Sequence, residues 1–440
     1  MIFSDPRLLV GFSKLVSSNF LAAVPLLFAN VIAARALGIS EYGQIAIVLA
    51  YTKLIDGFFN FQSVNVLTRF VAETLHSEDY SSLKGIIKAG VLIDGLTAFI
   101  ACALAVAGLP IVGALIGLSD ETTPFAIAFC LVIPSRILGV TEAILRNFEK
   151  FWTIGFRQVC LASLVALGWT VASWNALEVG AYLLIWLVAE LITNLWYISR
   201  AQAALRENSM SDIWRAGARA AIRKLEGFWR MLIQTNLTFG LRLLSQDADI
   251  IVAGTFLGPG AAAFLRVAKD LANFLGQIGR PLQQAASPRI SRKMVVGGPM
   301  SAVKYARTIA AVCAVLGMVF AASSFWWGGA VLSTLFGDDY RQAEILTVLL
   351  LFAKSTYLSG VTLLPLTVTL DRTGEFLRSV VYATLIYFTS MFLATPVLGL
   401  MGIALSHLVF ELSWSFYNWR RIYQDLPNLE AQYQSASPNS

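Results

Sequence analysis

Charged and amide side chains follow one helix face along an otherwise apolar segment near residues 262–284. The members of this stripe recur at steps of four and three residues: Arg266, Asp270, Asn273, Gln277, Arg280 and Gln284. Helical residues at that spacing lie on one side of the helix, so the pattern predicts a continuous polar face. Guanidinium groups on such a face could bind anions such as phosphate, amides could bind hydroxyl groups, and a carboxylate could carry a proton or a cation.

Two further apolar segments carry comparable stripes. The stripe near 232–256 consists of Thr235, Thr238, Arg242, Ser245 and Asp249. A weaker stripe near 43–66 consists of Thr52, Asp56, Asn60 and Ser63. Lys53 lies beside this third stripe, and Lys269 lies beside the first. A cation at the centre of a bilayer costs about 2.5–3.5 kcal/mol, so we expect the stripes to face the bundle interior or a water-filled cavity.

Each of these charges also has a purely structural explanation. Arg266 and Asp270 are four residues apart and can neutralise each other, as Arg242 can with Asp247 or Asp249. Several more charges interrupt apolar segments: Asp94, Arg136, Glu142, Glu190, Lys354 and Glu411. Taken singly, each of these is explained at least as well by holding helices together as by acting on a substrate.

The elements that must position these residues are membrane spans. Hydrophobic residues make up 57% of the 440 residues and charged residues 14%, whereas soluble proteins carry about 25% charged residues. Apolar stretches of about 20 residues, enough to cross a hydrocarbon core of ~30 Å, recur from end to end. We expect an all-α polytopic membrane protein with twelve spans, near 15–34, 43–66, 88–108, 123–145, 153–173, 178–198, 232–256, 262–284, 305–327, 343–368, 377–395 and 399–419.

The distribution of Lys and Arg supports this span count and predicts cytoplasmic N- and C-termini. With the N-terminus inside, most of the 33 Lys and Arg fall in inner loops, whereas the outer loops hold only Arg35 and Arg341. Cytoplasmic loops of membrane proteins carry such an excess, and a miscounted span would destroy it. The net charge of +6 is therefore explained by topology, and no nucleic-acid partner is expected.

The chain repeats itself at an offset of 220 residues. Gly38 matches Gly258, Gly117 matches Gly337, and Lys84 matches Lys304. Six spans in each half give both halves the same orientation, so they should be related by an axis along the membrane normal. We expect an N-terminal six-helix lobe over 1–199, a basic cytoplasmic linker over 200–230, a C-terminal six-helix lobe over 231–425 and a disordered tail over 426–440.

The sequence shows no catalytic or metal-binding constellation. The four cysteines are scattered over predicted spans and are expected to be buried thiols, while His76 and His407 are far apart. No Walker-type phosphate-binding loop occurs, so ATP is not the expected energy source. We therefore expect neither an enzyme nor a cofactor.

The order and spacing of several segments resemble the polysaccharide transporter family, which includes the O-antigen flippases. The segments are "ARALGISEYGQIAIV" (34–48), "TRFVAETLHSEDYSSLKG" (68–85), "SPRISR" (287–292) and "LFGDDYRQAEILTVLLLFA" (335–353). This family belongs to the multidrug/oligosaccharidyl-lipid/polysaccharide (MOP) exporter superfamily. The resemblance covers roughly residues 8–425 and implies two pseudo-symmetric six-helix lobes around a central cavity.

The resemblance implies a flippase of the bacterial inner membrane. Its cargo would be an undecaprenyl-pyrophosphate-linked oligosaccharide, a surface polysaccharide repeat unit, moved from the inner to the outer leaflet by alternating access. The family offers no invariant motif for these positions, so the site residues come from the stripes alone: the cations assigned to pyrophosphate binding are Arg242, Arg266, Lys269, Arg280 and Lys53, and the polar lining is Thr238, Asn273, Gln277 and Asn60. The resemblance also implies that an ion gradient drives transport. Candidate H⁺ or Na⁺ carriers are Asp56, Asp249 and Glu411. The expected partners are membrane lipids and polysaccharide assembly proteins.

The sequence leaves three alternatives open. A multidrug or cation antiporter of the same superfamily would favour acidic and aromatic pocket residues over Arg and Lys. A major-facilitator carrier also has six plus six spans, but residues 68–88 lack its loop signature. A membrane polysaccharide polymerase or ligase would need a large outer loop, whereas the outer loops expected here are short.

Overall fold

The computed structural model describes the backbone of residues 6–436 except positions 62, 78, 211 and 371. Within these residues every regular element is a helix. The chain divides into two compact units, unit 1 over Met1–Ala263 and unit 2 over Phe264–Ser440. The predicted lobe boundaries around 200–230 stay a prediction.

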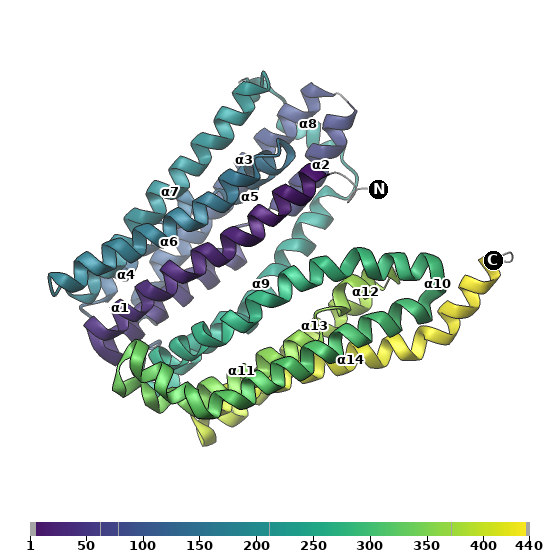
Figure 1. Cartoon of the computed structure of the whole chain (residues 1–440). Coiled ribbons are helices and arrows are strands. Elements are labelled where there is room, and N and C mark those ends of the chain that lie inside the picture. The colour runs from purple at the N-terminus through teal and green to yellow at the C-terminus, as the bar shows by residue number, and fades with distance from the viewer. Residues whose placement is uncertain (1–5, 62, 78, 211, 371, 437–440) are drawn as a thin grey trace. The chain divides into compact units, whose positions relative to one another are not determined.

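Unit 1 contains nine α-helices and the first residues of a tenth among its described residues (Figure 1). They are α1 (Pro6–Phe59), α2 (Val64–His76), α3 (Tyr80–Val112), α4 (Thr123–Cys130), α5 (Leu138–Asn147), α6 (Phe151–Trp174), α7 (Val179–Glu207), α8 (Ala218–Arg223), α9 (Phe228–Leu257) and the start of α10 (Pro259–Phe336). Short 3₁₀ turns occupy Ile133–Ser135 and Ile213–Arg215. Both α6 and α9 pack along α1.

Unit 2 holds the rest of α10 and four more α-helices among the described residues. They are α11 (Glu344–Ser359), α12 (Leu363–Thr369), α13 (Thr373–Leu398) and α14 (Leu400–Ala436), preceded by a 3₁₀ turn over Asp338–Ala343. Helix α14 continues into the segment predicted as a disordered tail. There the Tyr433 hydroxyl donates a 2.9 Å hydrogen bond to the Val295 carbonyl, which attaches the end of α14 to α10.

Two long helices are each a pair of spans joined at a glycine. The backbone of α1 turns at Gly38, where φ is 76° and ψ is −179°, and that of α10 turns at Gly298, where φ is 71° and ψ is −177°. This backbone region is open essentially to glycine alone, because a Cβ would collide with the neighbouring carbonyl. The turn at Gly38 separates the predicted spans 15–34 and 43–66.

The predicted repeat is visible in the backbone. Gly258 has φ 88° and ψ 170°, nearly the values of Gly38 at the matching position of the first half. Gly117 and Gly337, the second matching pair, also have positive φ, at 87° and 109°. Equivalent chain turns thus recur at the offset of 220 residues that the sequence predicts.

Three predicted spans are interrupted by breaks in the helix. The span near 43–66 breaks between the end of α1 at Phe59 and the start of α2 at Val64. The span near 123–145 breaks between α4 and α5, at residues 131–137, and that near 343–368 breaks at residues 360–362. At such breaks the backbone loses helical hydrogen bonds, so polar groups are available for other contacts deep in the bundle.

Eight helices in the described part of the chain are long and apolar enough to cross a membrane. They cover nine of the twelve predicted spans, because the first of them, Leu21–Phe59, includes two. The other three predicted spans lie in α9, in the first part of α10 and in α14. The first two of these carry the polar stripes, and α14 carries His407 and Glu411, so polar side chains lower the hydropathy of all three.

Candidate functional site

A charged interior site of unit 1 centres on Arg136. This residue lies in the break between α4 and α5, and its guanidinium binds Glu190 of α7 through Nε and Nη2, at 2.7 and 3.0 Å. Its Nη1 also donates to Asp56 of α1 at 3.2 Å. All three side chains are nearly buried, with 13%, 8% and 12% of their surfaces exposed. One cation thus holds two carboxylates from two different helices.

Asn60 completes this cluster at the break that follows α1. Its side-chain amide donates to the Asp56 carboxylate at 2.9 Å and to the backbone carbonyl of Arg136 at 3.1 Å. Asn60 is fully buried, so it supports the Asp56–Arg136 contact from within the bundle. We define Asp56, Asn60, Arg136 and Glu190 as the buried acidic cluster, which carries one surplus negative charge if both acids are ionised.

The sequence predicts Asp56 and Asn60 as functional residues but not their partners. Arg136 and Glu190 are recognisable in the sequence as charges in apolar spans, and neither has an opposite charge three or four residues away. That isolation is the one signal that they need partners on other helices. It does not identify those partners, because the packing of α1, α5 and α7 decides which charges meet.

A second ion pair joins α1 to α9. The Lys53 ammonium lies 2.6 Å from the Asp247 carboxylate. One turn away the two helices approach closely, since a Cβ on Gly57 would lie 2.2 Å from a methyl carbon of Leu243. Asn236 adds a 3.1 Å hydrogen bond from its side chain to the Phe58 carbonyl. The predicted substrate cation Lys53 therefore has an acidic partner, although 52% of its side chain is exposed.

The remaining stripe residues of α9 differ in exposure. Arg242 is exposed, and Thr238 is half-buried with its hydroxyl bonded to the Gln234 carbonyl at 2.7 Å. Asp249 is fully buried and accepts the backbone N–H of Ile250 at 2.9 Å. The stripe thus runs from a solvent-accessible cation to a buried acid along a single helix.

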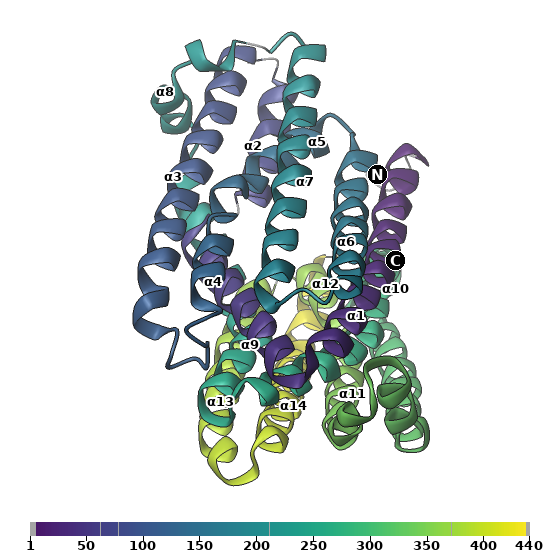
Figure 2. The ribbon, with the colours of Figure 1, turned by 90° about the vertical axis from the view of Figure 1, so that its left-hand side faces the viewer.

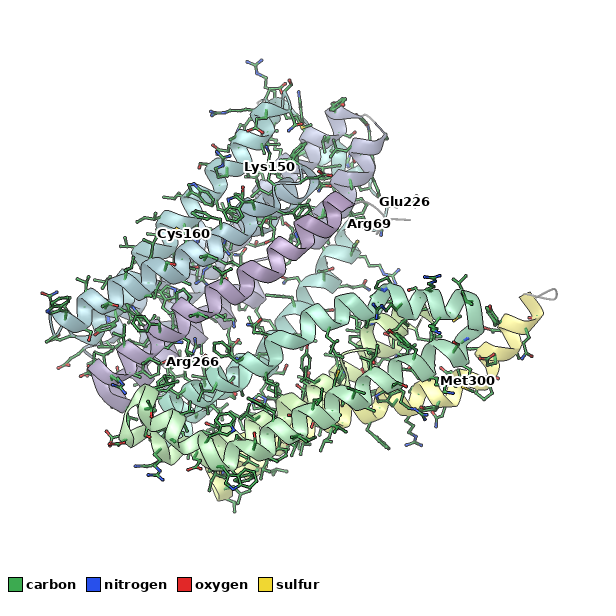
Figure 3. All side chains as sticks on the ribbon, in the orientation of Figure 1. Arg69, Lys150, Cys160, Glu226, Arg266 and Met300 are labelled. Atoms are coloured by element: carbon green, nitrogen blue, oxygen red, sulfur yellow. The ribbon has the colours of Figure 1, made fainter. Side chains whose placement is uncertain are left out.

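In unit 2 the stripe on α10 begins with an ion pair. The Arg266 guanidinium, labelled in Figure 3, lies 3.3 Å from Asp270 one turn later. Lys269 is buried, Gln277 is half-buried and Asn273 is exposed. The side chains of Arg280 and Gln284 lie outside the described residues. Glu411 is half-buried on α14, where the neighbouring His407 contacts the Tyr387 hydroxyl at 3.2 Å.

Charged side chains outside the spans gather at one end of unit 1. Arg69, Lys150 and Glu226 all lie at that end (Figure 3). There Lys84 of α3 pairs with Asp212 at 2.5 Å, and the Lys88 ammonium donates to the carbonyls of Trp214 and Ala216. These bonds attach residues 212–216, just before α8, to the N-terminal part of α3, and α8 itself lies beside α3 (Figure 2).

The residues in the described part of the chain provide no group of three or more His, Cys, Asp or Glu side chains able to hold a metal ion. The four cysteines are free thiols; Cys102 and Cys130 are buried, as predicted, whereas Cys160 and Cys313 are half-buried.

No family model matches the chain. The Escherichia coli K12 protein named "Inner membrane protein YghQ" is 24% identical over 334 residues, which cover 74% of this chain and 92% of that protein. Solved structures of MATE transporters are similar over nearly the whole length. The eukaryotic MATE transporter AtDTX14 has a TM-score of 0.64 at 16% identity, with 95% of this chain and 96% of that chain covered.

Two multidrug transporters are similar to the same degree. The inward-facing conformation of a multidrug resistance MATE transporter of the MOP superfamily has a TM-score of 0.66 at 13% identity, with 93% and 96% of the two chains covered. The MATE multidrug transporter DinF-BH, solved as a complex with a ligand, has a TM-score of 0.66 at 14% identity, with 96% of both chains covered. The predicted fold class is thus confirmed: the chain has the all-helical fold of these MATE transporter structures.

Proposed function

We propose that the chain is a multi-pass transporter of the bacterial cytoplasmic membrane that works by alternating access. Its helical fold is that of MATE transporters over nearly its whole length, and the E. coli relative is named as an inner membrane protein. A transporter of this kind needs no catalytic residues. The excess of Lys and Arg in the predicted inner loops assigns both termini to the cytoplasm.

The proposed cargo is an undecaprenyl-pyrophosphate-linked oligosaccharide, moved from the inner to the outer leaflet. The observation that carries this proposal is Arg242, an exposed guanidinium within a predicted span, on the same face of α9 as Thr238. A charge at that depth is costly unless it meets water or an anion. The planar fork of an arginine matches the oxygens of a pyrophosphate, and hydroxyl and amide groups suit its sugars.

The other predicted residues would contribute to binding the pyrophosphate and the sugars. Lys53, Arg266, Lys269 and Arg280 would add positive charge for the pyrophosphate, and Asn60, Asn273 and Gln277 would add polar lining. The pairs Lys53–Asp247 and Arg266–Asp270 imply that these cations exchange a carboxylate for phosphate when cargo binds. An H⁺ or Na⁺ gradient would drive the cycle, with Asp56, Asp249 and Glu411 as carriers, and polysaccharide assembly proteins would supply and remove the cargo.

A multidrug or cation antiporter is the second candidate. The buried acidic cluster favours it, because Asp56 and Glu190 share a single cation and leave a surplus carboxylate that could attract a cationic compound. Similar solved structures are multidrug transporters, and one of them is a complex with a ligand. The two candidates differ in the charge of the cargo.

Transport in proteoliposomes distinguishes the candidates. Purified wild-type protein and the variants Arg242→Gln and Arg280→Gln are compared for translocation of a lipid-pyrophosphate-linked oligosaccharide and for uptake of a cationic dye. Arg219→Gln is the matched control, since Arg219 is an exposed arginine of α8 outside the spans. We expect oligosaccharide translocation by the wild type and the control, and its loss in both test variants. Dye uptake without oligosaccharide translocation would overturn the flippase in favour of the antiporter.

A further inference from the structure

The segment just before α8 exposes a tryptophan and an arginine that are neighbours in the sequence. Trp214 has 59% of its surface exposed, and Arg215 is exposed as well. Among the residues that the structure describes, none forms an ion pair or a hydrogen bond with the Arg215 guanidinium. Asp212, three residues earlier, lies 2.5 Å from the Lys84 ammonium instead. Both exposed side chains are therefore available to a partner outside the protein chain.

The hydrogen bonds of Lys88 fix the depth of this pair along α3. The Lys88 ammonium donates to the carbonyls of Trp214 and Ala216, at 2.7 and 3.0 Å. Lys88 is also the first residue of the predicted span 88–108. From that point to its end, α3 is about 36 Å long, which is enough to cross a hydrocarbon core of ~30 Å. Trp214 and Arg215 therefore lie where the hydrocarbon meets the lipid headgroups.

The chain after this pair runs back along α3, away from the hydrocarbon. A Cβ on Gly85 would lie 2.6 Å from the Cβ of Ala221, and α8 lies beside this part of α3 (Figure 2). The Lys224 ammonium donates to the Ser82 hydroxyl at 3.0 Å and lies 3.6 Å from the Asp79 carboxylate. Later residues of the segment thus meet earlier residues of α3. Within the segment, the exposed tryptophan and arginine therefore lie closest to the hydrocarbon.

The surroundings of this pair carry surplus positive charge. Lys88 is bonded to carbonyls, and no carboxylate pairs with it within the described part of the chain. Lys84, Lys88 and Arg215 together face one carboxylate, that of Asp212. Anionic lipids attract cations at this depth, and tryptophan concentrates at the interface between membrane and water. Charge and depth therefore both fit an acidic lipid.

We propose that Trp214 and Arg215 bind an acidic phospholipid of the inner leaflet, of the phosphatidylglycerol class. The Arg215 guanidinium donates two hydrogen bonds to the phosphate oxygens, and Lys88 adds positive charge beside them. The Trp214 ring covers the glycerol and the start of an acyl chain. The bound lipid holds the segment before α8 at the membrane surface. The choice of leaflet rests on the topology given under the proposed function, whereas the lipid site itself does not.

Lipid binding can be counted by native mass spectrometry of the full-length protein in detergent. Phosphatidylglycerol and phosphatidylcholine are each titrated against the wild type, Arg215→Gln and Arg223→Gln. Arg223 is the matched control, because it is an exposed arginine of the same segment that follows Ala221 and lies further from the hydrocarbon. We expect Arg215→Gln to bind phosphatidylglycerol about fivefold more weakly than the wild type, and Arg223→Gln to match the wild type. Binding of phosphatidylcholine should change little in either variant.

Three results would overturn the proposal. Arg215→Gln might bind phosphatidylglycerol as tightly as the wild type does, which would leave Arg215 a solvated charge. Equal weakening in Arg215→Gln and Arg223→Gln would show general attraction to a basic segment without a built site. Displacement of phosphatidylglycerol by millimolar inorganic phosphate would assign the arginine to a soluble anion. Trp214→Ala provides the complementary test, since it should weaken the binding of both lipids.

Hydrogen exchange in nanodiscs locates the bound lipid. The protein is compared in phosphatidylcholine nanodiscs with and without phosphatidylglycerol. The acidic lipid should slow exchange of the amides over 213–217 in the wild type and in Arg223→Gln, but not in Arg215→Gln. Slowing that is equal in all three proteins would contradict the site. Neither measurement uses cargo, so a wild type that translocates no oligosaccharide lipid would refute the proposed function and leave the lipid result standing.

Discussion

The Lys53 ammonium lies 2.6 Å from the Asp247 carboxylate, and this pair joins α1 to α9 across a contact formed by Gly57 and Leu243. The lysine is half exposed while the aspartate is nearly buried, with 9% of its side chain exposed. Removal of the lysine therefore leaves a buried carboxylate without its cation, whereas removal of the aspartate leaves a cation that water can reach.

We predict that Lys53→Met destabilises the protein more than Asp247→Asn does. A double-mutant cycle should give a coupling of about 1 kcal/mol, because exposure of the lysine screens the pair. Thermal unfolding in detergent measures all three variants. The matched control is the exposed pair Arg69–Glu73, for which the same cycle should give a smaller coupling. Equal couplings for the two pairs would contradict the structural assignment of Lys53.

Arg136→Gln should be among the most damaging single substitutions in unit 1. It removes the one cation that holds Asp56 and Glu190, and breaking a buried pair in this way costs about 3–5 kcal/mol. Unfolding of the variant Arg136→Gln with Asp56→Asn and Glu190→Gln added provides the control, since neutral amides need no cation. We expect that triple variant to recover most of the lost stability. If Arg136→Gln unfolds like the wild type, the buried acidic cluster does not stabilise the fold.

Gly38 and Gly258, the glycines at the equivalent turns of the two halves, should both resist substitution because both have positive φ. Gly38→Ala and Gly258→Ala should each lower the free energy of unfolding by about 1–3 kcal/mol, because no other residue adopts their backbone angles at low cost. No atom lies within 4 Å of either added Cβ, so the loss would come from the backbone alone. Gly374 is equally uncrowded and has no positive φ, so Gly374→Ala should be neutral or stabilising.

The attachment of α8 to α3 should depend on acid pH. Hydrogen bonding to Lys84 lowers the pKa of the Asp212 carboxyl, and hydrogen bonds from Ser82 lower the pKa of the Asp79 carboxyl. A lowered pKa in the folded state stabilises the contact above the unfolded pKa of about 3.9, and this contribution disappears as the pH falls through the folded value.

Hydrogen exchange, corrected for the intrinsic effect of pH, measures this attachment. Amides over 212–224 should be protected at neutral pH and lose protection below about pH 4. Asp212→Asn should expose them already at neutral pH, whereas Asp120→Asn, which alters an acid in the segment between α3 and α4, should not. Retained protection in Asp212→Asn would show that the carbonyl bonds of Lys88 hold the segment alone.

Helices are the part of this structure that the sequence predicts well, because span length and charge distribution are local properties. All twelve predicted spans lie on helical segments, and the glycine turns recur at the predicted offset. The breaks inside three spans are harder to predict from the sequence. Ser63 and Asn60 are ordinary members of a polar stripe, and the sequence alone does not show that the helix stops between α1 and α2 at their position.

The sequence does not show which charged side chains form ion pairs with one another. Asp247 has Arg242 nearby on its own helix, yet its observed partner is Lys53 on α1. Arg136 meets acids that are 80 and 54 residues distant along the chain. Such choices follow from which helix faces come together, whereas Arg266 and Asp270, one turn apart, pair as their spacing suggests. Periodicity locates the charged faces, and packing decides what each charge contacts.

During synthesis, α1 leaves the ribosome before α9, and the face around Gly57 and Phe58 stays without α9 until all the helices between them have been made. That face is contacted by Phe239, Leu243 and Asn236 in the finished protein. Until then it must be covered by lipid, by the insertion machinery or by a temporary neighbour. The first half of the chain is therefore unable to complete its own packing, and its biogenesis depends on a helix encoded after the midpoint.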